Sequence, residues 1–156
     1  MTKTVIGKAA PAFNLPATGD KSVRLSSLKG QNVVLYFYPR DATPGCTTES
    51  QNFRDAAFAF EKANTIILGL SQDPIKSHEK FHQKQDLNFD LLSDESGDTC
   101  RKYGVLKMKN MYGKQFEGIE RSTFLINSAG VLHQEWRKVK VPGHVDDVLT
   151  AAQSLK

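Results

Sequence analysis

The sequence predicts an α/β domain in which a mixed central sheet is flanked by helices, and three observations support this prediction. Two apolar segments rich in β-branched residues, 32–39 and 65–71, are typical of strands buried on both faces. Segments with helical spacing of apolar residues alternate with these strands. The chain has 156 residues, 39% of them hydrophobic, which suits a single domain over residues 1–156.

The first half of the chain alternates strands with helices. Phe53 and Phe60 recur at helical spacing after the first buried strand, and this recurrence predicts a helix over residues 46–63. Pro74 stands where proline favours the first turn of a helix, so a surface helix is expected to begin there. In order, the expected elements are strands at 11–15, 23–25 and 32–39, a helix at 46–63, a strand at 65–71 and a helix at 74–85.

The second half is expected to complete the sheet. A short strand at residues 89–94 precedes a short helix that stops at Gly104. Residues 121–139 carry two strand-like runs around Ser-Ala-Gly, which predicts a hairpin. An amphipathic helix over residues 144–156 closes the chain.

Composition and charge exclude several classes of protein. The net charge is +4, but the 17 acidic residues are interspersed among the basic ones, so nucleic-acid binding is not expected. No segment has the 18 or more apolar residues of a membrane span, and the N-terminus lacks the apolar region of a signal peptide. Two cysteines are too few for a disulfide framework, so a reducing cytoplasm is expected, with neither a cofactor nor a metal.

The stretch DATPGCTTES places one cysteine, Cys46, at the expected start of the first long helix. The positive end of the helix dipole favours the thiolate there, and the thiolate is the nucleophilic form of cysteine. Pro44 presets the turn, Gly45 permits close approach of the backbone, and Thr43 offers a hydroxyl to the same pocket. A buried, inert cysteine is the alternative, and the Thr-Pro-Gly turn disfavours it by placing the sulfur at the end of the helix.

Several blocks of the sequence resemble one family. YPRDATPGCTTE spaces Pro39, Thr43 and Cys46 as Pro-x-x-x-Thr-x-x-Cys, and with LLSDE and GIERSTFLI it is similar to the peroxiredoxin Q subfamily, also called bacterioferritin comigratory protein. The similarity runs from KAAPAFNLP to the end of the chain. It implies a thioredoxin-like fold and a thiol-dependent peroxidase that reduces hydrogen peroxide and alkyl hydroperoxides through a cysteine sulfenic acid.

The resemblance also implies roles for individual residues. Cys46 would be the peroxidatic cysteine, and Thr43 would orient the peroxide. The pocket would be shielded from water by Pro39 and Pro44.

An arginine on a later strand belongs to the same implied site. Arg121, in ERSTFLI, would hold the thiolate and stabilise charge on the breaking bond, although alone it would be taken for a solvated charge at a strand end. Glu49 either positions Arg121 or is an acid favoured by the helix dipole.

The sequence departs from the subfamily at the resolving thiol. Many members carry a second cysteine five residues after the first, where this chain has Gln51, and others carry it near the second surface helix, where KFHQKQ has none. Cys100 is the remaining candidate, but a small buried packing residue is the favoured interpretation. An external thiol would then reduce the sulfenic acid, supplied by thioredoxin, glutaredoxin or a small molecule, and the protein would be a monomer or weak dimer.

Two other functions compete with this prediction. The segment HEKFH, residues 78–82, fits the pattern of zinc proteases, with Glu79 as general base. Lys80 would put a cation between the ligands, so a charged, solvent-facing helix is expected instead. The following histidines are all expected on the surface or in turns: His78, His82, His133 and His144. The third alternative is a non-enzymatic thioredoxin-like binding or chaperone module in which Cys46 is unreactive.

Overall fold

The structure, a computed structural model, describes residues 4–155. In chain order its elements are β1 (Asn14–Ala17), β2 (Lys21–Arg24), the 3₁₀ helix η1 (Leu25–Leu28), β3 (Asn32–Phe37), α1 (Pro44–Lys62), β4 (Thr65–Ser71), α2 (Ile75–Lys84), β5 (Asp90–Ser93), α3 (Asp98–Lys102), β6 (Leu106–Met111), β7 (Lys114–Ile119), β8 (Ser122–Ile126), β9 (Leu132–Trp136) and α4 (His144–Gln153). None of the helices within residues 4–155 is long and apolar enough to cross a bilayer.

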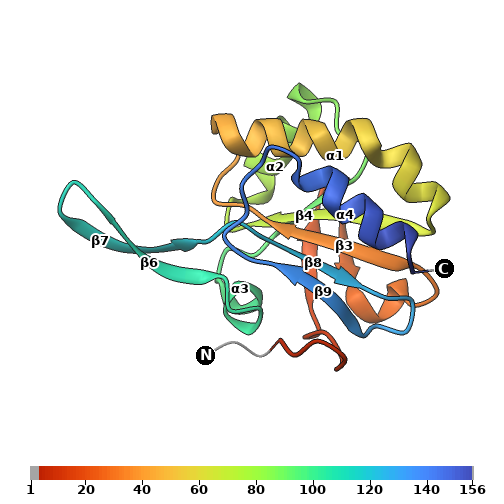
Figure 1. The fold of residues 1–156 in the computed structure, drawn as a ribbon. Coiled ribbons are helices and arrows are strands. Elements are labelled where there is room, and N and C mark those ends of the chain that lie inside the picture. The colour runs from red at the N-terminus through yellow and green to blue at the C-terminus, as the bar shows by residue number, and fades with distance from the viewer. Residues whose placement is uncertain (1–3, 156) are drawn as a thin grey trace.

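Seven strands form one mixed sheet, in the order β2-β1-β5-β4-β3-β8-β9. The central strands β3, β4 and β5 are parallel, whereas β1, β2, β8 and β9 pair antiparallel at the two sides. Figure 1 shows α1, α2 and α4 on one face of the sheet and α3 on the other. The predicted α/β architecture with a mixed central sheet is therefore confirmed.

Strand β3 is buried along its whole length and divides the interior into two cores. Val33, Leu35 and Phe37 belong to one core, with α3 and the N-terminal segment, because alternate side chains of a strand point to opposite faces. The intervening Val34 and Tyr36 belong to the second core, which α1, α2 and α4 cover. The core that contains α3 residues is called the α3 core, and the core that α1 helps to cover is called the α1 core.

A glycine in β4 allows the α1 core to pack closely. A Cβ at Gly69 would lie 2.7 Å from a methyl carbon of Leu91 and 2.9 Å from the Tyr36 ring. Without that Cβ the Tyr36 ring stacks on Phe53 of α1 at 4.6 Å between centroids, and its hydroxyl lies 2.8 Å from that of Ser50. These contacts fix α1 on the sheet immediately after the turn that carries Cys46.

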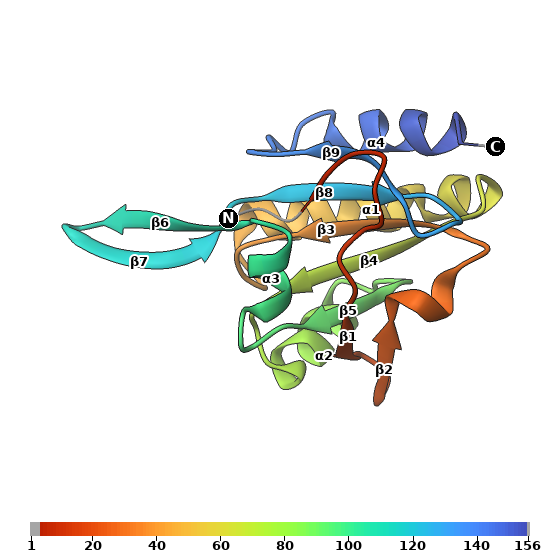
Figure 2. The same ribbon diagram turned by 90° about the horizontal axis from the view of Figure 1, so that it is seen from below.

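The structure differs from the predicted elements at several points. The first two strands are at residues 14–17 and 21–24 rather than at 11–15 and 23–25, and η1 was not predicted. The first helix begins at Pro44 rather than at Cys46, so proline takes its favoured first-turn position and Thr43 is the N-cap. An antiparallel pair, β6 and β7, was not predicted and projects from the body of the protein (Figure 2). Its turn has positive φ at both Tyr112 and Gly113, as a type I′ hairpin turn requires.

Candidate active site

Cys46 is the third residue of α1 and lies just beyond the C-terminal end of β3. Its side chain is buried, with 1% of the residue exposed. The first turn of a helix has backbone N–H groups without intrahelical partners, and these give the helix end its partial positive charge. The sulfur is thus held at the positive end of the longest helix in the described chain.

Arg121 links Cys46 to Glu49. Its Nη2 donates to Cys46 Sγ at 3.3 Å and its Nη1 donates to Glu49 Oε1 at 2.6 Å. Arg121 immediately precedes β8, and the antiparallel pairing of Ser122 with Phe37 brings this strand start to the end of β3. A Cβ at Gly45 would lie 3.2 Å from Arg121 Nη2, so glycine makes room for the guanidinium. One fork of donors therefore holds both the sulfur and the carboxylate.

Glu49 is fully buried, and its Oε2 has no hydrogen-bond partner among residues 4–155. Burial raises the pKa of its carboxyl to about 7, and the opposing effect of Arg121 does not overcome this. The carboxyl is consequently only partly ionised near neutral pH, so it neutralises the Arg121 charge incompletely. The remainder of that charge is available to the sulfur.

Thr43 and the two prolines are more exposed to solvent than Cys46. Thr43 is half-buried, and its hydroxyl donates to the carbonyl of Arg40 at 2.9 Å. Because its proton is engaged there, the Thr43 oxygen can accept a hydrogen bond from an incoming O–H group. Pro39 and Pro44 are both exposed. The predicted site residues thus gather around one loop, although no hydrogen bond joins Thr43 to the sulfur.

A buried network anchors the loop that leads to Cys46. The Asp41 carboxylate accepts from the Tyr38 hydroxyl at 2.6 Å and from the Ser77 hydroxyl at 2.8 Å. Its Oδ2 also lies 2.7 Å from Nδ1 of His78. The Asp41 N–H donates to Asp73 Oδ2 at 2.8 Å. Both the backbone and the side chain of Asp41 therefore bond to residues at or just before the start of α2, and these bonds anchor the loop.

The prediction that all four histidines lie on the surface or in turns is wrong for His78. It is fully buried, and its Nε2 lies 2.8 Å from the carbonyl oxygen of Leu92. The ligand atoms of Asp41, Asp73 and His78 lie close enough together to hold a metal ion. Both nitrogens of His78 are already hydrogen-bonded within the protein, however, which disfavours a zinc site on HEKFH.

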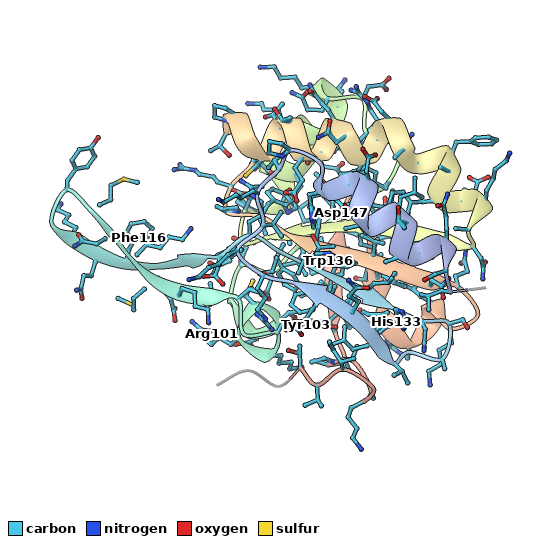
Figure 3. The ribbon with its side chains drawn as sticks, viewed as in Figure 1. Arg101, Tyr103, Phe116, His133, Trp136 and Asp147 are labelled. Atoms are coloured by element: carbon cyan, nitrogen blue, oxygen red, sulfur yellow. The ribbon has the colours of Figure 1, made fainter. Side chains whose placement is uncertain are left out.

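His144 is also buried, contrary to the same prediction. Its Nε2 lies 2.7 Å from the Thr123 hydroxyl, and its ring meets Phe53 and Trp136 edge-on in the α1 core (Figure 3 labels Trp136). Burial lowers the pKa of the imidazole to about 4, although Asp147 partly opposes this shift. His82 is half-buried and His133 is exposed.

Cys100 lies in α3 and belongs to the α3 core, on the opposite face of the sheet from Cys46. It is fully buried, and its backbone N–H donates to Asp94 at 2.8 Å. Burial, reinforced by the charge of Asp94, raises the pKa of its thiol well above the usual range. The surroundings of Cys100 are thus apolar side chains of the α3 core, apart from the neighbouring Asp94.

Comparison with known proteins relates this site to one family. Residues 6–135 match the AhpC/TSA family. The chain is 48% identical over 156 residues to peroxiredoxin Bcp of Xanthomonas campestris, covering 99% of this chain and 98% of the relative. It is 46% identical over 151 residues to peroxiredoxin Bcp of Bacillus subtilis, covering 97% and 94%.

Solved structures agree with these relatives. A peroxiredoxin Q structure from X. campestris superposes with a TM-score of 0.90 at 46% identity, covering 97% of this chain and 98% of that one. That protein has also been solved with serine in place of a cysteine at its position 48 or 84, positions 36 residues apart. Counting the same interval from Cys46 leads to His82, which carries no thiol.

Proposed function

The chain belongs to the AhpC/TSA family and, within it, to the Bcp or peroxiredoxin Q group, and on this basis we propose that Cys46 is its peroxidatic cysteine. Members of this group are thiol peroxidases, and this chain is a thiol peroxidase with a thioredoxin-like fold. The zinc-protease and non-enzymatic alternatives are therefore set aside. The observation that carries the assignment of Cys46 is its hydrogen bond from Arg121 at the start of α1.

In the proposed reaction, the Cys46 thiolate attacks one oxygen of the peroxide. A sulfur–oxygen bond forms while the oxygen–oxygen bond breaks, which yields the sulfenic acid and a hydroxide or alkoxide. The leaving oxygen takes a proton and departs as water or an alcohol. Arg121 stabilises the negative charge that passes from the sulfur to this oxygen, because its fork is fixed by Glu49 before the peroxide arrives.

The surrounding residues position the substrate. The Thr43 oxygen accepts a hydrogen bond from the peroxide O–H and so orients the bond that breaks. Glu49 holds Arg121 in place, which makes it a positioning residue. The exposed Pro39 and Pro44 border the entrance and limit the access of water. Substrates are hydrogen peroxide and alkyl hydroperoxides, the latter supported by work on alkyl peroxide reduction by the X. campestris protein.

The sulfenic acid is recycled by an external thiol. A disulfide requires Cα atoms within about 7 Å, whereas Cys46 and Cys100 belong to cores on opposite faces of the sheet. The first external thiol forms a mixed disulfide with Cys46 and releases water, and a second thiol then releases Cys46. The reductant is thioredoxin, glutaredoxin or a small thiol, and the reaction takes place in the cytoplasm. The protein acts as a monomer or weak dimer with a single domain in each chain.

Trapping the oxidised cysteine tests this cycle. The protein is treated with one equivalent of hydrogen peroxide and a sulfenic-acid reagent, followed by a thiol-alkylating reagent and intact-mass analysis without reduction. We expect one sulfenic adduct at Cys46 and, after unfolding, one alkyl group at Cys100. A chain two hydrogens lighter with both thiols blocked would show that Cys100 is the resolving cysteine.

A further inference from the structure

The hairpin of β6 and β7, here called the arm, exposes a group of large apolar side chains. Of the seven exposed large hydrophobic residues in the described chain, four lie on it: Met108, Met111, Tyr112 and Phe116. The arm reaches out from the body beyond the sheet, and Phe116 lies well outside the two cores (Figure 3). Apolar side chains that gather on a projecting element commonly mark an interaction site.

Positive charge accompanies two of these side chains, Met111 and Phe116, on one face of the arm. The pairing of Lys109 with Phe116 and of Met111 with Lys114 places these four residues on the same face, together with Lys107. The only acid of the two strands, Glu117, pairs with Met108 on the opposite face and forms an ion pair with Arg101 at 3.2 Å. The first face is thus both apolar and cationic.

The cationic face is turned toward the side of the sheet that carries Cys46. At the base of the arm, the face opposite the cationic one carries Leu106 and Ile119, and both side chains pack into the α3 core. The cationic face is therefore directed away from that core at the base. The last residue of the arm, Ile119, stands two residues before Arg121, so the base of the arm lies beside the proposed active site.

We propose that the cationic face of the arm docks the protein thiol reductase that regenerates Cys46, through an acidic and apolar surface next to the reductase's reactive cysteine. This inference rests on the external-thiol cycle proposed above. Strands of six residues give the arm a length of about 20 Å. A reductase of about 100 residues is roughly 30 Å across, so one placed over Cys46 also covers the base of the arm.

A second copy of the chain fits the same surface poorly. Lys107, Lys109 and Lys114 would face the same three lysines of the other copy if two arms paired through this face. Like charges placed opposite each other are destabilising, and complementary charge is what selects partners at such surfaces. Charge complementarity therefore favours an acidic partner.

The test compares two charge-reversed variants. Lys107→Glu/Lys114→Glu alters exposed residues of the arm, whereas the matched control Lys29→Glu/Lys62→Glu alters exposed residues at the other end of β3 and α1. For each protein, the KM for thioredoxin and for glutaredoxin, turnover with dithiothreitol and the rate of the first oxidation are measured. We expect the arm variant to raise the KM for the protein reductant by about tenfold, with dithiothreitol turnover and first oxidation unchanged.

Three results would overturn the docking proposal. An unchanged KM in the arm variant would do so, as would an equal loss of turnover with dithiothreitol, which would mean that the arm supports the fold. A concentration-dependent dimer of the wild type that the arm variant abolishes would identify a second copy as the occupant. Failure of the wild type to turn over with either protein reductant, while dithiothreitol works, would instead refute the proposed protein-thiol cycle itself.

Discussion

Each face of the central sheet buries one cysteine, and the two cysteines have neighbours of opposite charge. Cys46 and Cys100 are both almost inaccessible to solvent. Cys46 faces the guanidinium of Arg121 at a helix start, whereas Cys100 lies against the carboxylate of Asp94. A cation favours the thiolate and a carboxylate opposes it. Burial alone therefore does not decide whether a thiol is reactive, and the charge of the neighbouring group does.

Replacing each cysteine separately gives the largest expected contrast. Cys46→Ser should reduce peroxide consumption to the uncatalysed rate, because the attacking sulfur is gone. Cys100→Ala should leave the first oxidation and turnover with an external thiol intact, since it removes one buried sulfur from the α3 core. Stopped-flow oxidation and a peroxide-consumption assay measure both effects. Loss of turnover in Cys100→Ala, with a normal first oxidation, would break the contrast between the two faces.

Changes around Cys46 should have the next largest effect. Arg121→Ala and Thr43→Val each remove a preorganised hydrogen-bonding group, which should slow the first oxidation about 10²–10³-fold. Arg101→Ala and Thr48→Val are matched controls, because both side chains are exposed and neither contacts the sulfur. Stopped-flow rates and circular dichroism separate catalysis from folding. Equal rates for a site variant and its control would remove that residue from the mechanism.

The smallest expected effect is a pH dependence of stability between pH 4 and 7, which Glu49 and His144 give to the α1 core. Glu49 ionises near pH 4.5 when unfolded but near pH 7 when folded, so its contribution to stability is complete below pH 4.5 and is lost as the pH rises to 7. His144 binds its proton near pH 6.5 when unfolded but near pH 4 when folded. Its contribution is complete above pH 6.5 and is lost as the pH falls to 4.

Between pH 4.5 and 6.5 these two slopes have opposite sign and about equal size, about 1.4 kcal/mol per pH unit. Relative to wild type, Glu49→Gln should gain stability as the pH rises through this window, and His144→Gln should lose it. Urea denaturation at pH 4.5, 5.5 and 6.5 measures the difference from wild type. Parallel curves for wild type and both variants would mean that neither group titrates differently on unfolding.

The sequence predicted the sheet and the loop well because both depend on local patterns. Each of these patterns occupies one short stretch of consecutive residues: the apolar run of β3, that of β4, and the segment from Pro39 to Cys46. Arg121 was placed at the site only by resemblance, since it is 75 residues from Cys46 and alone has the pattern of a surface charge.

The remaining features depend on contacts that local patterns do not contain. The sequence predicts a surface position for His78 because its partner, Asp41, is 37 residues away. His78 nevertheless lies three residues before the buried Phe81, which places it on the inner face of α2. The sequence does not predict the arm because its strands bury little and mix apolar with charged residues on one face, so that no clear strand pattern results.

Hydrogen peroxide can supply little binding free energy, and for this reason the anchoring of the loop by Asp41 and His78 matters to substrate binding. Hydrogen peroxide has two non-hydrogen atoms, and a ligand gains at most about 1.5 kcal/mol for each such atom. That is too little to order a mobile segment, because fixing the backbone of each residue costs roughly 1–2 kcal/mol. The loop before Cys46, with Ala42 held at a φ of 65°, is instead ordered by the interior of the protein during folding. A substrate this small thus meets a pocket whose conformational entropy has already been lost.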